Sequence, residues 1–85
     1  MALSVLNLPE KAKEITLAVH YFPGKTSEWY SQNIDWLKAL SLYATDLFLS
    51  EAVRAGYLKD AQESPGSSTL IYRCTRKGTA LAKNY

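Results

Sequence analysis

The chain has 85 residues, of which 47% are hydrophobic and 21% charged, and these proportions are typical of a single small folded domain. No apolar run approaches the roughly 18 residues that span a membrane. Residues 1–8 lack the basic start of a signal peptide, so we expect a cytoplasmic protein without a membrane segment. The single cysteine, Cys74, cannot form an internal disulfide, which fits a reducing compartment.

The charges are unevenly placed along the chain. Residues 1–58 carry five basic and six acidic side chains, whereas residues 59–85 carry five basic and two acidic ones. A basic second half indicates either a surface that attracts phosphate groups or a solvated surface with a small excess of lysine and arginine.

The first predicted helix spans residues 7–22. Asn7 is suited to cap it, since Glu10 follows at the spacing of a capping box. Apolar residues recur at helical spacing and predict a buried stripe that contains Ala12, Ile15, Val19 and Phe22. His20 is the only histidine and has no second ligand nearby, so we expect it at the surface and expect neither a metal nor a cofactor.

The second predicted helix spans residues 27–40 and is rich in aromatic residues. Trp29 and Trp36 lie on a broad apolar face. This face has more aromatic surface than one side of a small helix is expected to bury. Either both tryptophans complete the core, or one of them lies in an interface with a partner or a second copy.

The third predicted helix spans residues 44–55, follows a short joint at 41–43, and ends at Gly56, a residue favoured just after a helix. In a helix-turn-helix arrangement its outer face would enter the major groove of DNA. That face carries Tyr43, Asp46, Leu47, Ser50 and Arg54. Because it includes an acidic residue and an apolar one, a face turned toward solvent or toward a protein is the alternative.

A β-hairpin is predicted next, with strands at 57–62 and 69–75 and a flexible tip that contains Ser67 and Ser68. A turn at Lys77-Gly78 then leads into a short helix at 78–83. Arg76 and Lys77 are predicted either to hold phosphate beside the hairpin or to be solvated charges of the turn.

Two segments together resemble a known family. Residues 56–58 (GYL) and residues 72–81 (YRCTRKGTAL) resemble the winged helix-turn-helix regulators of bacteria and archaea. In that family a Gly-Leu-Ile-like end of the recognition helix leads to a β-hairpin wing, and a Tyr-Arg-Leu-Thr-x-Lys-Gly-x-x-Leu run follows. Cys74 stands where leucine is usual.

The resemblance implies an α+β fold over residues 1–85: a single winged-helix domain of three helices, a hairpin wing and a short C-terminal helix. It implies a small protein that binds double-stranded DNA, a transcriptional regulator that acts as a homodimer, with the third helix in the major groove and the wing on phosphates. The residues that it assigns to DNA are Tyr43, Asp46, Ser50, Arg54, Lys59, Ser67, Ser68, Arg73, Arg76 and Lys77.

A protein-interaction module on the same scaffold, as in winged helices of viral or plasmid origin, is the alternative. Trp29, Trp36 and Leu47 are its candidate interface residues. We do not expect an enzyme, because the chain has no glycine-rich phosphate loop and no cysteine–histidine metal spacing.

Overall fold

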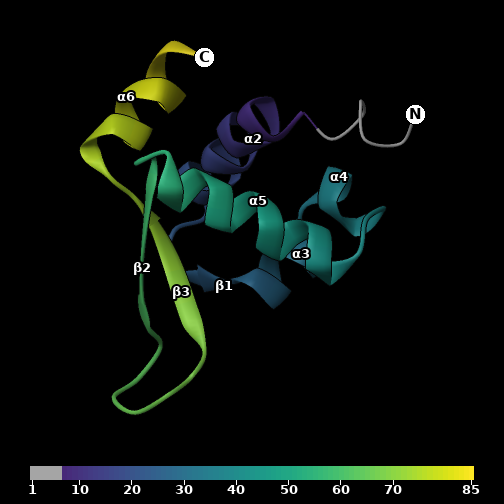
Figure 1. Cartoon of the computed structure of the whole chain (residues 1–85), viewed down its shortest axis with the longest axis vertical. Coiled ribbons are helices and arrows are strands. Elements are labelled where there is room, and N and C mark those ends of the chain that lie inside the picture. Colours follow the sequence, from purple (N-terminus) through teal and green to yellow (C-terminus); the bar gives the residue numbers. More distant parts are fainter. Residues whose placement is uncertain (1–6) are drawn as a thin grey trace.

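The structure, a computed structural model, describes residues 7–85, which form five helices and a three-stranded antiparallel sheet (Figure 1). The predicted α+β class is therefore confirmed. The predicted domain also includes residues 1–6, which lie outside the described residues.

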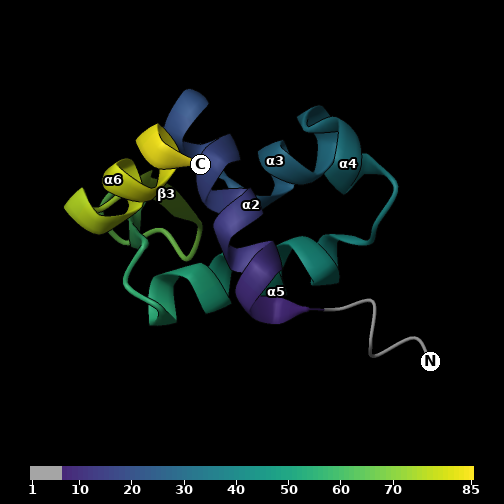
Figure 2. The ribbon, with the colours of Figure 1, turned by 90° about the horizontal axis from the view of Figure 1, so that it is seen from above.

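Helix α2 (Leu8–Tyr21) begins as predicted, because Oδ1 of Asn7 accepts a hydrogen bond from Glu10 N at 3.3 Å. It packs against helix α5 (Leu42–Arg54), and Figure 2 shows the two helices crossing. The core lies between the helices and one face of the sheet, and its largest fully buried side chains include Ile15, Tyr30, Leu37, Phe48 and Leu49.

The predicted helix over 27–40 is wrong, since two helices occupy that segment: α3 (Ser27–Asn33) and α4 (Asp35–Lys38). Between them Ile34 is extended, with φ −98° and ψ 119°. The break turns Leu37 into the core and lets the Trp36 ring stack on Phe48, with ring centroids 5.9 Å apart. Tertiary packing therefore overrides a helical pattern that contains no glycine or proline.

Helix α5 starts two residues earlier than predicted, after Ser41, whose hydroxyl accepts from Ala44 N at 3.1 Å. Tyr43 consequently lies in its first turn and not in a joint. At the other end Gly56 adopts φ +88° and donates to Val53 O at 3.0 Å, while Tyr57 N donates to Ala52 O at 2.9 Å. This pair of bonds is the glycine-dependent helix ending that the sequence predicts.

The sheet has the strand order β1 (Lys25–Thr26), β3 (Leu70–Cys74), β2 (Leu58–Gln62). Strand β1 was not predicted, because two residues carry no periodicity. It pairs with β3, and the β2–β3 hairpin projects beyond the helices (Figure 1).

Helix α6 (Arg76–Asn84) begins two residues before the predicted start. Thr75 caps it by accepting from Gly78 N at 3.1 Å. Arg76 and Lys77 therefore belong to the first turn of a helix, which packs against α2, and the predicted turn at Lys77-Gly78 is wrong.

Candidate nucleic-acid interface

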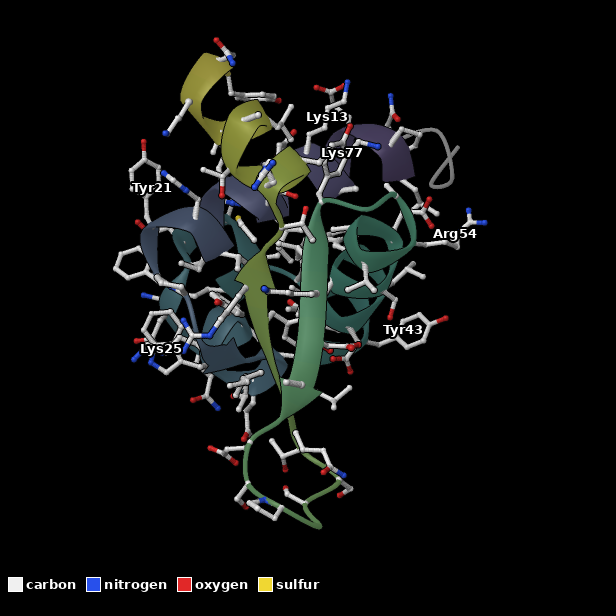
Figure 3. All side chains as sticks on the ribbon, turned by 90° about the vertical axis from the view of Figure 1, so that its left-hand side faces the viewer. Lys13, Tyr21, Lys25, Tyr43, Arg54 and Lys77 are labelled. Atoms are coloured by element: carbon white, nitrogen blue, oxygen red, sulfur yellow. The ribbon has the colours of Figure 1, made fainter. Side chains whose placement is uncertain are left out.

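The face of the sheet that points away from the helices carries basic side chains. Lys59 and Arg73 are paired in the β2–β3 register and are both exposed, whereas the next residue on β3, Tyr72, is buried against the helices. Since side chains alternate along a strand, Lys59 and Arg73 share the outer face. Figure 3 looks onto this side of the molecule.

The Arg73 side chain extends from β3 toward the turn that precedes β1. A Cβ added at Gly24 would lie 3.0 Å from Nη2 of Arg73, so the guanidinium lies against the backbone of Gly24. Lys25 is the next residue, and its Nζ lies 5.2 Å from the centroid of the Trp29 ring. Each of the three strands therefore carries a basic side chain, and Lys25 is paired in the register with Tyr72, the residue before Arg73.

Two further basic residues lie in the first turn of α6, and the structure gives them different surroundings. Nζ of Lys77 donates to Ala55 O at 2.8 Å and lies 5.0 Å from the centroid of the Tyr57 ring. This ammonium group therefore stabilises the C-terminal end of α5. Arg76 is exposed. We call Lys25, Lys59, Arg73 and Arg76 the basic strip.

The ion pairs of the described residues 7–85 leave the basic strip uncompensated. Each of them joins residues three apart on one helix: Lys11–Glu14, Lys38–Asp35 and Arg54–Glu51. Within the described part of the chain no carboxylate lies within 4.0 Å of a strip nitrogen. The positive charge of the strip is thus available to an anionic ligand.

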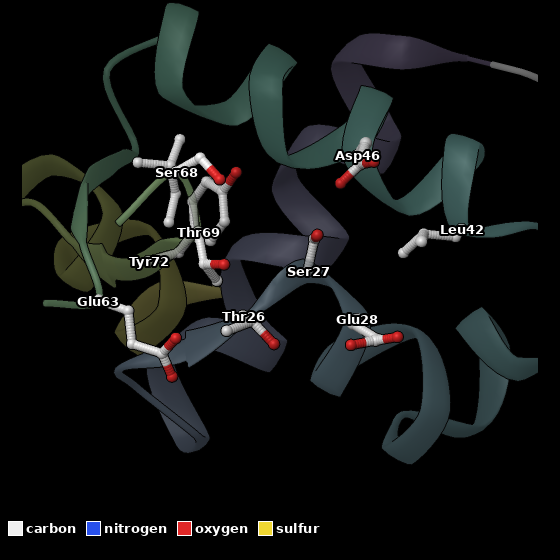
Figure 4. A pocket seen from close by; sticks show the side chains of 10 residues that line it. Thr26, Ser27, Glu28, Leu42, Asp46, Glu63, Ser68, Thr69 and Tyr72 are labelled. Atoms are coloured by element: carbon white, nitrogen blue, oxygen red, sulfur yellow. The ribbon is translucent and has the colours of Figure 1, made fainter. Parts of the chain in front are cut away.

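The outer face of α5 is chemically different from the basic strip. Tyr43, Ser50 and Arg54 are exposed on it as predicted. Nη2 of Arg54 lies 3.2 Å from Oε2 of Glu51, so this guanidinium, unlike those of the basic strip, has an acidic partner within the described residues. Asp46 points from this helix into a groove that α5 shares with α3 and the hairpin (Figure 4).

That groove has a volume of about 610 Å³, and we call it the acidic groove. Its lining contains three carboxylates and no basic side chain: Thr26, Ser27, Glu28, Leu42, Asp46, Glu63, Ser68, Thr69, Leu70 and Tyr72. Burial, with the nearby charges of Asp46 and Asp60, raises the pKa of the Tyr72 phenol. A groove of this charge repels phosphate.

The two serines of the hairpin tip also differ in their surroundings. The Ser67 hydroxyl accepts from Thr69 N at 3.0 Å and so orders the tip. Ser68 lines the acidic groove. Ser68 therefore lies with Asp46, on the side of the hairpin that carries the carboxylates.

The three predicted protein-interface residues are half-buried. Trp29 and Trp36 both pack against the core, and Nζ of Lys11 lies 5.2 Å from the Trp36 ring centroid. Leu47 is also half-buried, so it is less exposed than the sequence indicates.

Sequence reasoning missed Lys25, Tyr21 and Phe22. Phe22 was expected in the buried stripe of the first helix, but α2 ends at Tyr21 and 46% of Phe22 is exposed. No local signal identifies Lys25, because only the pairing of β1 with β3 brings it to Tyr72, the residue before Arg73.

The described residues were also compared with the requirements of metal binding, of a reactive thiol and of a membrane span. They contain no group of three or more histidine, cysteine and acidic side chains placed to hold a metal ion. Burial raises the pKa of the Cys74 thiol, which disfavours its reactive thiolate form. Over residues 7–85 no helix is both long and apolar enough to cross a membrane.

Comparison of the chain with protein-family models, with curated proteins and with solved structures gives no match. The surfaces described above are therefore what indicates a function.

Proposed function

We propose that this protein binds the phosphate backbone of double-stranded DNA through the basic strip, on a scaffold of the winged-helix type. Helix α5 corresponds to the recognition helix of that scaffold and the β2–β3 hairpin to its wing. Four strip residues per chain give modest affinity that depends steeply on salt, because each phosphate contact releases counterions.

The observation that carries this proposal is the pairing of Lys59 with Arg73. Like charges directly opposite each other on a sheet destabilise it by a few tenths of a kcal/mol to about 1 kcal/mol. Neither side chain has an acidic partner within the described residues. A phosphate group bound between Lys59 and Arg73 would remove this repulsion. We therefore propose that the pair is a phosphate-binding site.

The acidic groove determines how such a complex is oriented. Glu28, Asp46 and Glu63 lie on the side where α5 and the hairpin tip meet, so a phosphate backbone is repelled from it. We therefore expect the outer face of the sheet to meet DNA first. Contacts of this kind fix the position of the protein and carry no direct sequence information.

The test is fluorescence anisotropy of a labelled random-sequence duplex, titrated with protein between about 50 and 200 mM salt. Arg73→Ala is expected to weaken binding and to reduce the slope of log affinity against log salt by about 1. Lys38→Ala is the matched control, because this exposed lysine on α4 is paired with Asp35, and it is expected to change neither quantity.

The neighbours Arg76 and Lys77 give a second comparison. Arg76→Ala is expected to weaken duplex binding without lowering stability, and Lys77→Ala to lower stability through the lost bond to Ala55 O. Absence of duplex binding at the lowest salt would contradict the proposal. A loss of duplex binding with Arg54→Ala but not with Arg73→Ala would mean that α5, and not the basic strip, contacts DNA.

The acidic groove favours a second candidate function, a protein-interaction module. Leu42 and Leu70 are exposed at its rim beside the three carboxylates, a combination that suits a segment with alternating basic and apolar residues. A lysine- and leucine-containing peptide is then expected to bind, and Asp46→Asn to weaken it. Peptide binding that ignores Asp46→Asn would count against this candidate.

A further inference from the structure

An aromatic edge borders the basic strip, made by Tyr21, Phe22 and Trp29. Tyr21 is 69% exposed and Phe22 is 46% exposed, so neither ring serves mainly to fill the core. The rings of Phe22 and Trp29 lie 5.5 Å apart between centroids and are inclined by 45°. Two of these rings thus pack together, and Tyr21, which precedes Phe22 in the chain, has its ring beside His20 at 5.1 Å between centroids.

The turn between α2 and β1, which carries Phe22, is fixed at both ends. Tyr30, a fully buried residue, donates its hydroxyl proton to Phe22 O, and Gly24 N donates to Tyr72 O at 2.8 Å. The backbone beneath Phe22 is therefore anchored to the core and to β3. An exposed ring on an anchored backbone loses little conformational entropy when it contacts a ligand.

Positive charge lies beside the Trp29 ring and beside the turn that carries Phe22. The Lys25 ammonium is 5.2 Å from the Trp29 ring centroid, and the Arg73 guanidinium lies against Gly24. In Figure 3 Tyr21 and Lys25 lie on the same side of the molecule. Aromatic faces next to cationic groups are what unpaired nucleotides require, since bases stack on the rings while phosphates meet the charges.

We infer that the aromatic edge holds unpaired bases of single-stranded DNA, whose backbone follows the basic strip. This inference rests on the proposed phosphate-binding function and adds a preference for unpaired nucleotides. A second copy of this chain or another protein explains the exposed rings less well, because it would have to cover Lys25 and Arg73, which lack acidic partners within the described residues.

The experiment compares a labelled oligothymidine strand with a duplex of the same length by fluorescence anisotropy at low salt. Tyr21→Ala is expected to weaken single-strand binding by roughly 5- to 150-fold, the range that corresponds to the loss of one stacked base, and to leave duplex binding within about twofold. Tyr85→Ala is the matched control, because this tyrosine is 57% exposed and its hydroxyl contacts only Glu10 among the described side chains, and it is expected to change neither.

Tryptophan fluorescence tests directly whether bases contact the aromatic edge. In a Trp36→Phe background, the fluorescence of Trp29 is expected to be quenched when oligothymidine binds. Circular dichroism of each variant establishes that it folds, and Phe22→Leu, which removes the second exposed ring but keeps an apolar side chain, is expected to weaken single-strand binding in the same way.

The outcomes separate this inference from the proposed function. If Arg73→Ala weakens both ligands while Tyr21→Ala and Phe22→Leu weaken neither, stacking is wrong and phosphate binding stands. If neither DNA form binds at low salt, both fail. If Tyr21→Ala instead converts a dimer to a monomer in sedimentation and leaves single-strand binding unchanged, the edge is an interface between copies and the inference is overturned.

Discussion

At the scale of single residues, the pair Lys59 and Arg73 links binding to stability. Lys59→Glu places a carboxylate opposite Arg73 in the β2–β3 register. The free energy of unfolding is expected to rise by about 0.2–1 kcal/mol, while affinity for duplex DNA falls. Urea unfolding and anisotropy measure the two changes.

Lys59→Gln is the control for this change, because it removes the repulsion without adding attraction. It is expected to give a smaller gain in stability and a smaller loss of affinity than Lys59→Glu. A fall in the stability of both variants would show that the lysine is held by favourable contacts and would remove the main argument for a binding site.

Because Tyr30 is buried, the free energy of unfolding is expected to depend on pH in the alkaline range. Burial raises the pKa of this phenol from 10.0 to about 12. The folded protein keeps the phenol neutral where the unfolded chain ionises it, so this contribution to stability is complete below pH 10 and is lost as the pH rises toward 12. The loss amounts to roughly 2–3 kcal/mol.

Tyr30→Phe removes this titration together with the hydrogen bond to Phe22 O. The variant is expected to be less stable than the wild type by about 1 kcal/mol at neutral pH, and the two stability curves are expected to cross between pH 10 and 12, so that the variant is the more stable protein at higher pH. Chemical denaturation at a series of pH values measures both curves. Parallel curves over this range would contradict the conclusion that the alkaline loss of stability comes from the Tyr30 phenol.

At the scale of elements, α6 lies so close to the start of the hairpin that its third residue has to be glycine. A Cβ added at Gly78 would lie 2.0 Å from Tyr57 O. Replacing a helical glycine by alanine ordinarily stabilises a helix by about 1 kcal/mol. Here Gly78→Ala is expected to destabilise the protein by roughly 1–3 kcal/mol, because α6 has to move away.

Thermal unfolding of Gly78→Ala decides the sign of this effect. Gly66→Ala is the comparison, since a Cβ there meets nothing within 4 Å and only its φ of +81° opposes the change. A higher melting temperature for Gly78→Ala would mean that the close approach of α6 to Tyr57 is not maintained in solution.

Elements with a strong local signal could be predicted from the sequence. The caps at Asn7 and Gly56 determine where α2 begins and α5 ends, and both were found because they depend on residues close in sequence. The break at Ile34 and strand β1 were missed, because each depends on packing or pairing with distant segments.

The candidate site follows the same division. Lys59, Arg73 and Arg76 lie in the basic second half of the chain, and the family resemblance proposed them as DNA contacts. Their separation from Asp46 and Glu63 could not be predicted, because it depends on which side of the hairpin faces α3 and α5. Lys77 was assigned to phosphate, but only the folded chain brings it to Ala55 O.

At the scale of the whole molecule, the sheet separates opposite charges. Lys59 and Arg73 of the basic strip lie on its outer face, and the carboxylates of Glu28, Asp46 and Glu63 line the groove that Tyr72 reaches from its other face. The net charge of +2 conceals this polarity. The electric field of an anionic partner turns a protein with such a charge distribution before the two come into contact. This orientation raises the rate of productive encounter at low salt.

The central position of β3 has a consequence for synthesis of the protein. Both β1 and β2 pair with this strand, and it supplies Tyr72 to the core. A nascent chain that has not yet reached Leu70 can form α2, α3 and α5 but has no partner for either strand. Lys25, Lys59 and Arg73 therefore come together only when translation has passed β3, so that an unfinished chain on the ribosome lacks the assembled surface with which we propose the protein holds DNA.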